Sequence, residues 1–153
     1  MAQFEISIVI NCQIDDAFLF LTAPAKVVSI SEPGMGLTLI SGAEQLAQGD
    51  RVEFELTGFG VAQKMVHEIT LLERPHRFVE KQLEGPLKSV SHEHLFEEDE
   101  NGFVTITDRI EFEPPGGMLG FVMTEDFLTR NLRSSFEYRH QKLKEILESN
   151  KTT

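Results

Sequence analysis

Hydrophobic and polar residues alternate strictly at the start of the chain. Every second residue from 4 to 10 is apolar, and the residues between them include Glu5 and Ser7. The four apolar residues are Phe4, Ile6, Ile8 and Ile10. A period of two residues is typical of a half-buried strand, which this pattern predicts over residues 3–11.

The period changes directly after this first strand. Asp15 or Asp16 can cap a short helix, and Thr22 with Pro24 can begin a second short helix. The sequence EPGMG at 32–36 combines proline and glycine and ends the helical pattern. Two short helices are therefore expected between the first strand and the rest of the chain.

From residue 37 to residue 113 the pattern is that of strands joined by tight turns. We expect strands near 37–41, 51–57, 62–72, 77–83, 89–97 and 103–113. The links contain turn-forming pairs such as Gly49-Asp50, Gly85-Pro86 and Asn101-Gly102. Parallel strands would need crossovers of about a dozen residues or more, so these short links predict an antiparallel meander.

A long amphipathic helix is predicted over residues 118–148, after the PPGG sequence that closes the last strand. Its apolar residues recur at spacings typical of one helix face and are Phe121, Leu128, Leu132, Phe136, Leu143 and Leu147. The apolar face of the sheet is the surface available to this stripe. We therefore expect a single α+β domain over residues 1–153.

The composition restricts the possible partners. Subtracting 25 acidic from 14 basic residues gives a formal net charge of -11. Such a charge repels nucleic acid backbones and anionic membrane surfaces, so neither is expected as a partner. No apolar run approaches the length of a membrane span, which is about 18 residues. The oligomeric state does not follow from the sequence.

The single cysteine and the first residues favour a cytoplasmic protein. Cys12 cannot form an internal disulfide, and MAQFEISIVI lacks the basic segment of a secretory signal peptide. No sequence signature of an activated thiol surrounds Cys12. We interpret it as a small buried hydrophobic residue.

The order of elements, together with four sequence stretches, resembles one superfamily. The stretches are APAKV at 23–27, GDRVEFELTGFG at 49–60, HEITLLERPHRFVEKQLEGPLKSVSHEHLFEE at 67–98 and TITDRIEFEPPGG at 105–117. They resemble the START-like or SRPBCC superfamily, which includes birch-pollen-allergen-like proteins and polyketide cyclases, and within it the bacterial single-domain ligand-binding branch. The resemblance implies a helix-grip fold, in which a curved antiparallel sheet of about seven strands wraps around the long C-terminal helix.

The resemblance also implies a cavity between the sheet and the long helix. A curved sheet and a straight helix cannot touch along their whole lengths, which permits the same conclusion. The apolar residues expected to line the cavity are Phe54, Met65, Phe96, Leu128, Leu132 and Phe136. Phe59 and Met118 lie in apolar, glycine-rich loops and are candidate lids. Large side chains could instead fill the cavity.

Several polar residues are expected on the inner face of the sheet. Alternation places His67, His92, His94 and Asp108 on that face. The hairpin between the last two strands pairs residues whose numbers sum to about 200 or 202, so Asp108 faces His92 or His94. For the strand at 77–83 the pattern allows either Phe78, Glu80 and Gln82 or Val79, Lys81 and Leu83 to point inward.

Other polar residues have less definite positions. Arg109, Arg130 or Arg139 could reach a ligand acid at the edge of the cavity, but salt bridges to surface glutamates are the favoured interpretation. Tyr138 could supply a hydroxyl to the cavity, and its facing on the helix is not determined by the pattern.

Three interpretations of the inward histidines remain open. A zinc site needs three or four ligands, and the third would have to be His67, which lies two strands away from the other pair. General acid or base catalysis could use His92, His94 and Asp108. The favoured interpretation is that the polar residues orient a bound ligand or satisfy one another, so no metal and no cofactor are expected.

The resulting functional hypothesis is the binding of a hydrophobic or amphipathic small molecule, such as a lipid, a polyketide or an isoprenoid-like compound. His67, His92, His94 and Asp108 would be the polar residues of that site. Two alternatives stay open: a cyclase-like, dehydratase-like or hydrolytic enzyme, and a regulatory interaction module.

Overall fold

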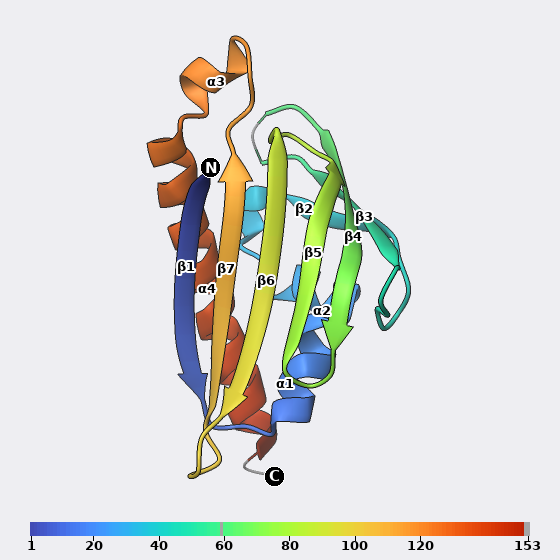
Figure 1. Ribbon diagram of the computed structural model, residues 1–153, viewed down its shortest axis with the longest axis vertical. Helices are drawn as coiled ribbons and strands as arrows, with labels where there is room; N and C mark the ends of the chain where they lie inside the picture. The colour runs from blue at the N-terminus through green and yellow to red at the C-terminus, as the bar shows by residue number, and fades with distance from the viewer. Residues whose placement is uncertain (59, 152–153) are drawn as a thin grey trace.

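The computed structural model describes residues 1–58 and 60–151, and these form one seven-stranded sheet (Figure 1). The strands are β1 (Ala2–Ile10), β2 (Leu37–Ser41), β3 (Arg51–Leu56), β4 (Gln63–Glu73), β5 (Arg77–Glu84), β6 (Ser89–Glu98) and β7 (Val104–Glu113). Their order in the sheet is β1-β7-β6-β5-β4-β3-β2, and every neighbouring pair is antiparallel. The predicted meander, with the first strand added beside the last, is confirmed.

Helices cover one face of this sheet. They are α1 (Ile14–Leu21), α2 (Pro24–Ser29), the 3-10 turn η1 (Pro33–Met35) and α4 (Glu125–Lys151), whereas the short helix α3 (Leu119–Val122) lies beyond the end of β7 (Figure 1). Figure 1 shows α4 in red running behind β1 and β7, with α1 and α2 in blue behind the other strands. This arrangement is the helix-grip fold expected from the sequence.

The start of α1 differs from the prediction. The residue that precedes the helix is Gln13, and Asp15 and Asp16 lie within its first turn. The predicted aspartate cap is therefore wrong. The two carboxylates still lie near the positive end of the helix dipole, where negative charge is favourable.

The predicted helix over 118–148 is interrupted near Thr124. The Thr124 hydroxyl accepts a hydrogen bond from the backbone N–H of Phe127 at 3.2 Å, so Thr124 caps the long helix α4. The short helix α3 precedes this break, and its Phe121 is 85% exposed. Phe121 therefore does not belong to the apolar stripe, which begins at Leu128.

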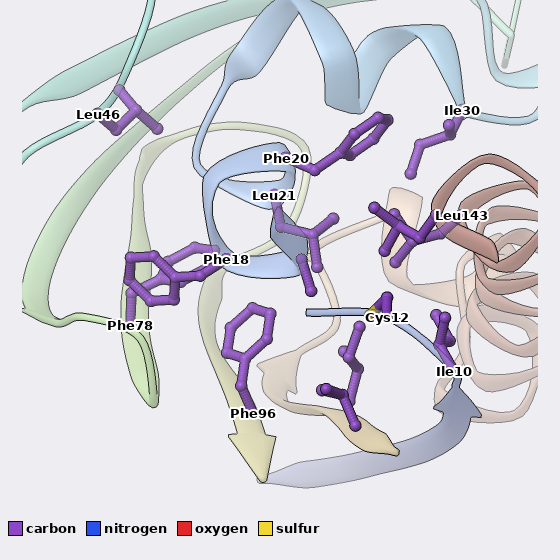
Figure 2. Close-up of a cluster of buried hydrophobic side chains, with 14 of the residues drawn as sticks. Ile10, Cys12, Phe18, Phe20, Leu21, Ile30, Leu46, Phe78, Phe96 and Leu143 are labelled. Carbon is purple, nitrogen blue, oxygen red and sulfur yellow. The ribbon is translucent and has the colours of Figure 1, made fainter. Parts of the chain in front are cut away.

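A hydrophobic core fills the space between α1, the sheet and the C-terminal half of α4 (Figure 2). The Phe18 ring lies between the rings of Phe78 and Phe96, with centroid distances of 5.7 and 5.2 Å. Leu143 of α4 and Cys12 belong to the same core, and both are buried. This end of the domain is closely packed, which leaves the other end for a cavity.

A second apolar cluster lies toward the opposite end of α4. Its buried residues include Phe4 of β1, Phe112 of β7, and Leu128 and Phe136 of α4. The rings of Phe4 and Phe136 are 6.0 Å apart and tilted by 51°. This cluster joins the first half of α4 to the β1–β7 edge of the sheet.

The strand register decides which polar residues point inward. His94 pairs with Asp108 across β6 and β7, as one of the two predicted registers requires. In β5, Phe78 and Glu80 lie opposite His94 and His92, so the undecided strand presents Phe78, Glu80 and Gln82 inward. The carboxylate of Glu80 therefore lies on the inner face, on the central strand of the sheet.

A register shift in β4 changes one expected core residue. The shift lies between Ile69 and Leu71, and after it Leu72 packs against the core in place of Leu71. Strict alternation from His67 and Ile69 would place Leu71 on that face. One extra residue in a strand reverses the facing of all residues beyond it.

The described helices include none with the length and apolar character needed to cross a membrane.

Candidate functional site

A cavity of about 370 Å³ lies between the sheet and the first half of α4. Its size is within the usual range for small-molecule pockets, roughly 300–1,000 Å³. The apolar residues of its wall are Leu56, Met65, Val90, Ile110, Phe112, Met123, Leu128, Leu132 and Phe136. Residues of η1 and Gly58 complete the wall at the edge near β3.

Polar residues occupy one part of this wall. His67 of β4, Glu80 of β5 and His92 of β6 come from three adjacent strands and all line the cavity. Gln82 lines it too, and its side-chain N–H donates to the carbonyl of Leu87 at 2.7 Å. The cavity is therefore mainly apolar, with a polar patch built on the sheet. Further polar residues of the wall come from the segment before η1 and from α4, and these are Ser31, Glu32, Asn131, Ser135 and Arg139.

The residues predicted to form the site divide into two groups. Those that line the cavity are Met65, His67, His92, Leu128, Leu132 and Phe136. Those that lie outside its wall are Phe54, His94, Phe96 and Asp108. Phe96 belongs to the core below α1, and Phe54 packs against that core. Of the three candidate catalytic residues, only His92 reaches the cavity.

Asp108 is the centre of a buried polar network. Its Oδ1 accepts a hydrogen bond from His92 Nε2 at 2.7 Å, and its Oδ2 accepts one from His140 Nε2 at 2.6 Å. His94 Nδ1 lies 3.2 Å from Oδ1. Asp108 itself is only 2% exposed. A buried carboxylate without partners would cost several kcal/mol, so three imidazoles around it explain its position.

His140 was missed by the sequence interpretation. It lies on α4 one turn after Phe136 and one turn before Leu143, and is 3% exposed. The i, i+4, i+7 spacing of these three residues was the available signal.

Glu80 is the second carboxylate of the network. Its Oε1 accepts a hydrogen bond from His67 Nδ1 at 3.2 Å. His92 Nδ1 lies 3.6 Å from Oε1, and His94 Nε2 lies 3.7 Å from Oε2. The two carboxylates therefore hold four histidines between them, one from each of β4 and α4 and two from β6.

Burial and hydrogen bonding oppose each other at both carboxylates. Burial alone would raise the pKa of Glu80, but the hydrogen bond from His67 and the nearby imidazoles of His92 and His94 hold this pKa well below its usual value. The pKa of Asp108 is likewise held low, because hydrogen bonds from its histidines, His140 first, outweigh burial. Both side chains are carboxylates at neutral pH.

His94 is buried between two other rings. Its ring stacks on Phe78 at 3.9 Å on one side and on His92 at 3.7 Å on the other. Burial would lower the pKa of His94, but Asp108 and Glu80 raise it above its usual value. Neither ring nitrogen of His94 has a partner with hydrogen-bond geometry among the described residues, despite the nearby carboxylates.

His67 also keeps one nitrogen without a partner. Its Nδ1 is bound by Glu80, while its buried Nε2 has no hydrogen bond within the described part of the chain. The side chain belongs to the cavity wall. A polar atom of a bound molecule could satisfy this nitrogen.

Arg139 of α4 contributes a positive charge to the cavity wall. Its guanidinium lies over the Phe136 ring at 4.6 Å, and no carboxylate of the described residues forms an ion pair with it. Burial lowers the pKa of Arg139, an effect that Asp108 and Glu80 partly oppose. The side chain stays charged at neutral pH, because arginine begins from a pKa above 12.

The other basic candidates lie elsewhere. Arg109 forms ion pairs with Glu5 at 2.7 Å and Glu93 at 2.9 Å, as the favoured interpretation expected. Arg130 is exposed, and neither it nor Tyr138 lines the cavity. Arg139 is thus the one of these candidates that can reach a ligand.

The two proposed lids cannot be assigned that role. Phe59 lies outside the described residues. Met118 is 86% exposed and is not part of the cavity wall. Met123, at the end of α3, is buried and does line the cavity.

A family model described as "Polyketide cyclase / dehydrase and lipid transport" matches residues 1–148. The chain belongs to this family. The match covers all seven strands and nearly all of α4, so it includes the whole cavity. A search of curated proteins found no match.

Solved structures show the same fold at low sequence identity. The di-domain ARO/CYC StfQ from the steffimycin biosynthetic pathway aligns with a TM-score of 0.80 and 19% identity, over 99% of this chain and 52% of StfQ. Protein CV1439 from Chromobacterium violaceum aligns with a TM-score of 0.76 and 10% identity, over 97% and 99% of the two chains. Ara h 8.0201 aligns with a TM-score of 0.60 and 14% identity, over 93% and 97%. Together with the family match, these similarities place the chain in the SRPBCC superfamily.

Proposed function

We propose that this family member binds a hydrophobic or amphipathic small molecule, of the lipid, polyketide or isoprenoid kind, between the sheet and α4. The observation that carries the proposal is the cavity of about 370 Å³ with its largely apolar wall. Binding of an apolar ligand in a cavity of this size is favourable, because it removes apolar surface from contact with water. The family description, which names cyclases, dehydrases and lipid transport, supports the same ligand class.

The polar patch favours an amphipathic ligand over a pure hydrocarbon. His67 Nε2 is a buried nitrogen of the wall without a partner among the described residues, and Arg139 offers a charge that no described carboxylate pairs with. A ligand with one oxygen-bearing end would satisfy these groups while its apolar part contacts Leu128, Leu132 and Phe136. In most apolar pockets, a small number of polar groups fix the orientation of the ligand.

The first experiment identifies the ligand and locates its site. The protein is purified gently, and native mass spectrometry with organic extraction shows whether a small molecule is bound. In parallel, the binding of the neutral dye Nile red is measured by fluorescence. Leu132→Trp adds an indole to the cavity wall, whereas Val9→Trp adds one to the outer face of the sheet, where Val9 is 49% exposed.

The two variants give opposite expectations. Leu132→Trp weakens dye binding by about tenfold or more, equivalent to about 1.4 kcal/mol, because the indole occupies ligand space. Val9→Trp leaves the affinity unchanged. The wild-type chain has no tryptophan, so the fluorescence of each new indole also reports whether the variant is folded. Equal dye affinity in a folded Leu132→Trp variant would contradict ligand binding in the cavity.

A further inference from the structure

Three donor groups face one another here, two from the polar patch of the cavity wall and one, His94, from outside that wall. Glu80 of β5 lies opposite His92 of β6, and His94 follows two residues later on the same face. One donor atom from each of the three residues lies within 4.8 Å of the others. His92 and His94 are only 5% and 4% exposed.

The donor distances are longer than hydrogen bonds and close to those between metal ligands. Glu80 Oε1 is 3.6 Å from His92 Nδ1, and Glu80 Oε2 is 3.7 Å from His94 Nε2. A tetrahedral zinc ion with bonds of about 2.0–2.1 Å separates its donor atoms by roughly 3.3 Å. Each of these two distances exceeds that value by only a few tenths of an ångström. The rings of His92 and His94 are stacked with their planes 26° apart, so they would also have to turn to direct both nitrogens at one ion.

Hydrogen bonds hold His92 and Glu80 from behind, and a carboxylate oxygen lies near His94 without hydrogen-bond geometry. Asp108 Oδ1 lies 2.7 Å from His92 Nε2 and 3.2 Å from His94 Nδ1, which are the nitrogens that face away from Glu80. His67 donates to Glu80 at 3.2 Å. Carboxylates on the distal nitrogens of metal-bound histidines fix the ring orientation and the tautomer. With protons on the Asp108 side, the lone pairs of both rings point toward Glu80.

One donor atom is otherwise difficult to explain. His94 Nε2 is buried and has no hydrogen-bond partner among residues 1–58 and 60–151. Buried polar atoms are nearly always satisfied, and a missing ion is one accepted reason for an exception. The charges agree with this explanation, because one divalent cation balances the two carboxylates Glu80 and Asp108.

We propose that Glu80, His92 and His94 form a binding site for a divalent transition metal, and that zinc is the ion that suits this His2Glu set. Three protein ligands leave a fourth position for water or substrate, as in catalytic zinc sites. Glu80 and His92 line the cavity, so the fourth position faces the bound molecule. The metal would then act as a Lewis acid on an oxygen of that molecule.

The inference corrects the reason for expecting no metal. From the sequence, the third ligand had to be His67, which belongs to β4 and is separated from β6 by β5. The structure supplies Glu80 from the intervening strand, whose facing the sequence left undecided. His67 instead supports Glu80 from behind.

The test begins with the wild-type protein. The metal content of gently purified protein is measured by mass spectrometry, and the protein is then treated with a chelator and titrated with ZnCl2 by calorimetry. We expect one zinc per chain. Titration with Co²⁺ should give the intense visible absorption of a four-coordinate ion, a signal that does not depend on any variant.

Two substitutions assign the ion to the site. His94→Gln should weaken zinc binding by about 100-fold or more. Loss of a group that only supports a ligand typically costs about 10–100-fold, so a larger loss indicates a direct ligand. His76→Gln is the matched control, because His76 is exposed, lies in the turn before β5 and is not one of the three donor residues. It should leave the affinity unchanged. Circular dichroism confirms that each variant is folded.

Two outcomes would overturn the proposal. The first is a wild-type titration that shows no stoichiometric zinc and no four-coordinate cobalt spectrum, which would leave a purely hydrogen-bonded network. The second is equal zinc affinity in wild type and folded His94→Gln. Nile red binding is measured without metal, so failure of the metal site and failure of ligand binding are distinguishable.

Discussion

Asp108 Oδ2 lies 2.6 Å from Nε2 of His140, and this hydrogen bond joins β7 to α4. Both residues are almost fully buried, at 2% and 3% exposure. The contact lies between the packed core around Phe18 and the cavity end of the domain. It fixes α4 against β7 at the point where close packing gives way to the cavity.

Replacing His140 with leucine should therefore destabilise the domain. The substitution leaves Oδ2 of Asp108 buried without its partner, which costs about 1–3 kcal/mol. Urea unfolding followed by circular dichroism measures the change. The exposed His76→Leu should change the free energy of unfolding by less than about 0.5 kcal/mol. A similarly small loss for His140→Leu would show that the contact does not stabilise the fold.

Gly58 should not tolerate a side chain. A Cβ atom on Gly58 would lie 2.2 Å from the carbonyl oxygen of Gly34 in η1, whereas a Cβ on Gly34 meets nothing within 4 Å. Gly58→Ala must therefore move the backbone at the cavity edge, at a cost of about 1–3 kcal/mol. Gly34→Ala is the matched control and should be nearly neutral. Thermal unfolding of the two variants compares them, and equal midpoints would contradict the close backbone approach.

Arg139 should select ligands with an acidic end. Its guanidinium lines the cavity without a carboxylate partner among the described residues. Arg139→Gln should weaken the binding of dodecanoic acid by about tenfold, or 1.4 kcal/mol, through loss of a charge-assisted hydrogen bond. Binding of 1-dodecanol should change little. Calorimetry with both compounds separates these effects.

The control for that comparison is Arg133→Gln, because Arg133 is exposed on the same helix and lies over the Phe4 ring. It should affect neither compound. If Arg139→Gln weakened acid and alcohol equally, the residue would contribute packing and not charge recognition.

Zinc should stabilise the chelator-treated protein against heat. A ligand that binds only the folded state at 100 times its dissociation constant adds about 2.7 kcal/mol. For a domain of this size that corresponds to a rise of roughly 5 °C or more in the unfolding midpoint. Differential scanning calorimetry of wild type and His94→Gln measures it. An equal rise in both proteins would assign the effect to ions bound elsewhere.

The sequence predicted the sheet accurately because alternation is a direct consequence of one buried face. Every strand end lies within one residue of its predicted position, and Asp108 pairs with His94, one of its two predicted partners. Turn residues set the links and hence the register. The helix-grip arrangement followed from the order of elements.

The errors have local physical causes. The helix prediction ran through Thr124, because the apolar spacing gave no sign of a cap, and this placed Phe121 in the core. The extra residue in β4 exchanged Leu71 for Leu72. Neither feature changes the hydrophobic period enough to be visible in the sequence.

The candidate site was predicted only in part, because it depends on contacts between distant elements. Facing alone identified His67, His92, His94 and Asp108, but could not tell which of them reach the cavity. Whether Glu80 points inward depended on the length of the turn after β5. Whether His140 reaches Asp108 depended on how α4 lies against the sheet. Such relationships are properties of the packed domain and not of a single strand or helix.

The pairing of β1 with β7 also has a consequence for how the chain is made. Ser7 and Thr107 share a hydrogen bond of 2.8 Å although they are 100 residues apart in the sequence. At a synthesis rate of about 5–20 residues per second, β1 waits roughly 5–20 s for its partner to leave the ribosome. The first strand to be synthesised is thus among the last to be paired. Until β7 emerges, the apolar face of β1 must be kept from other nascent chains.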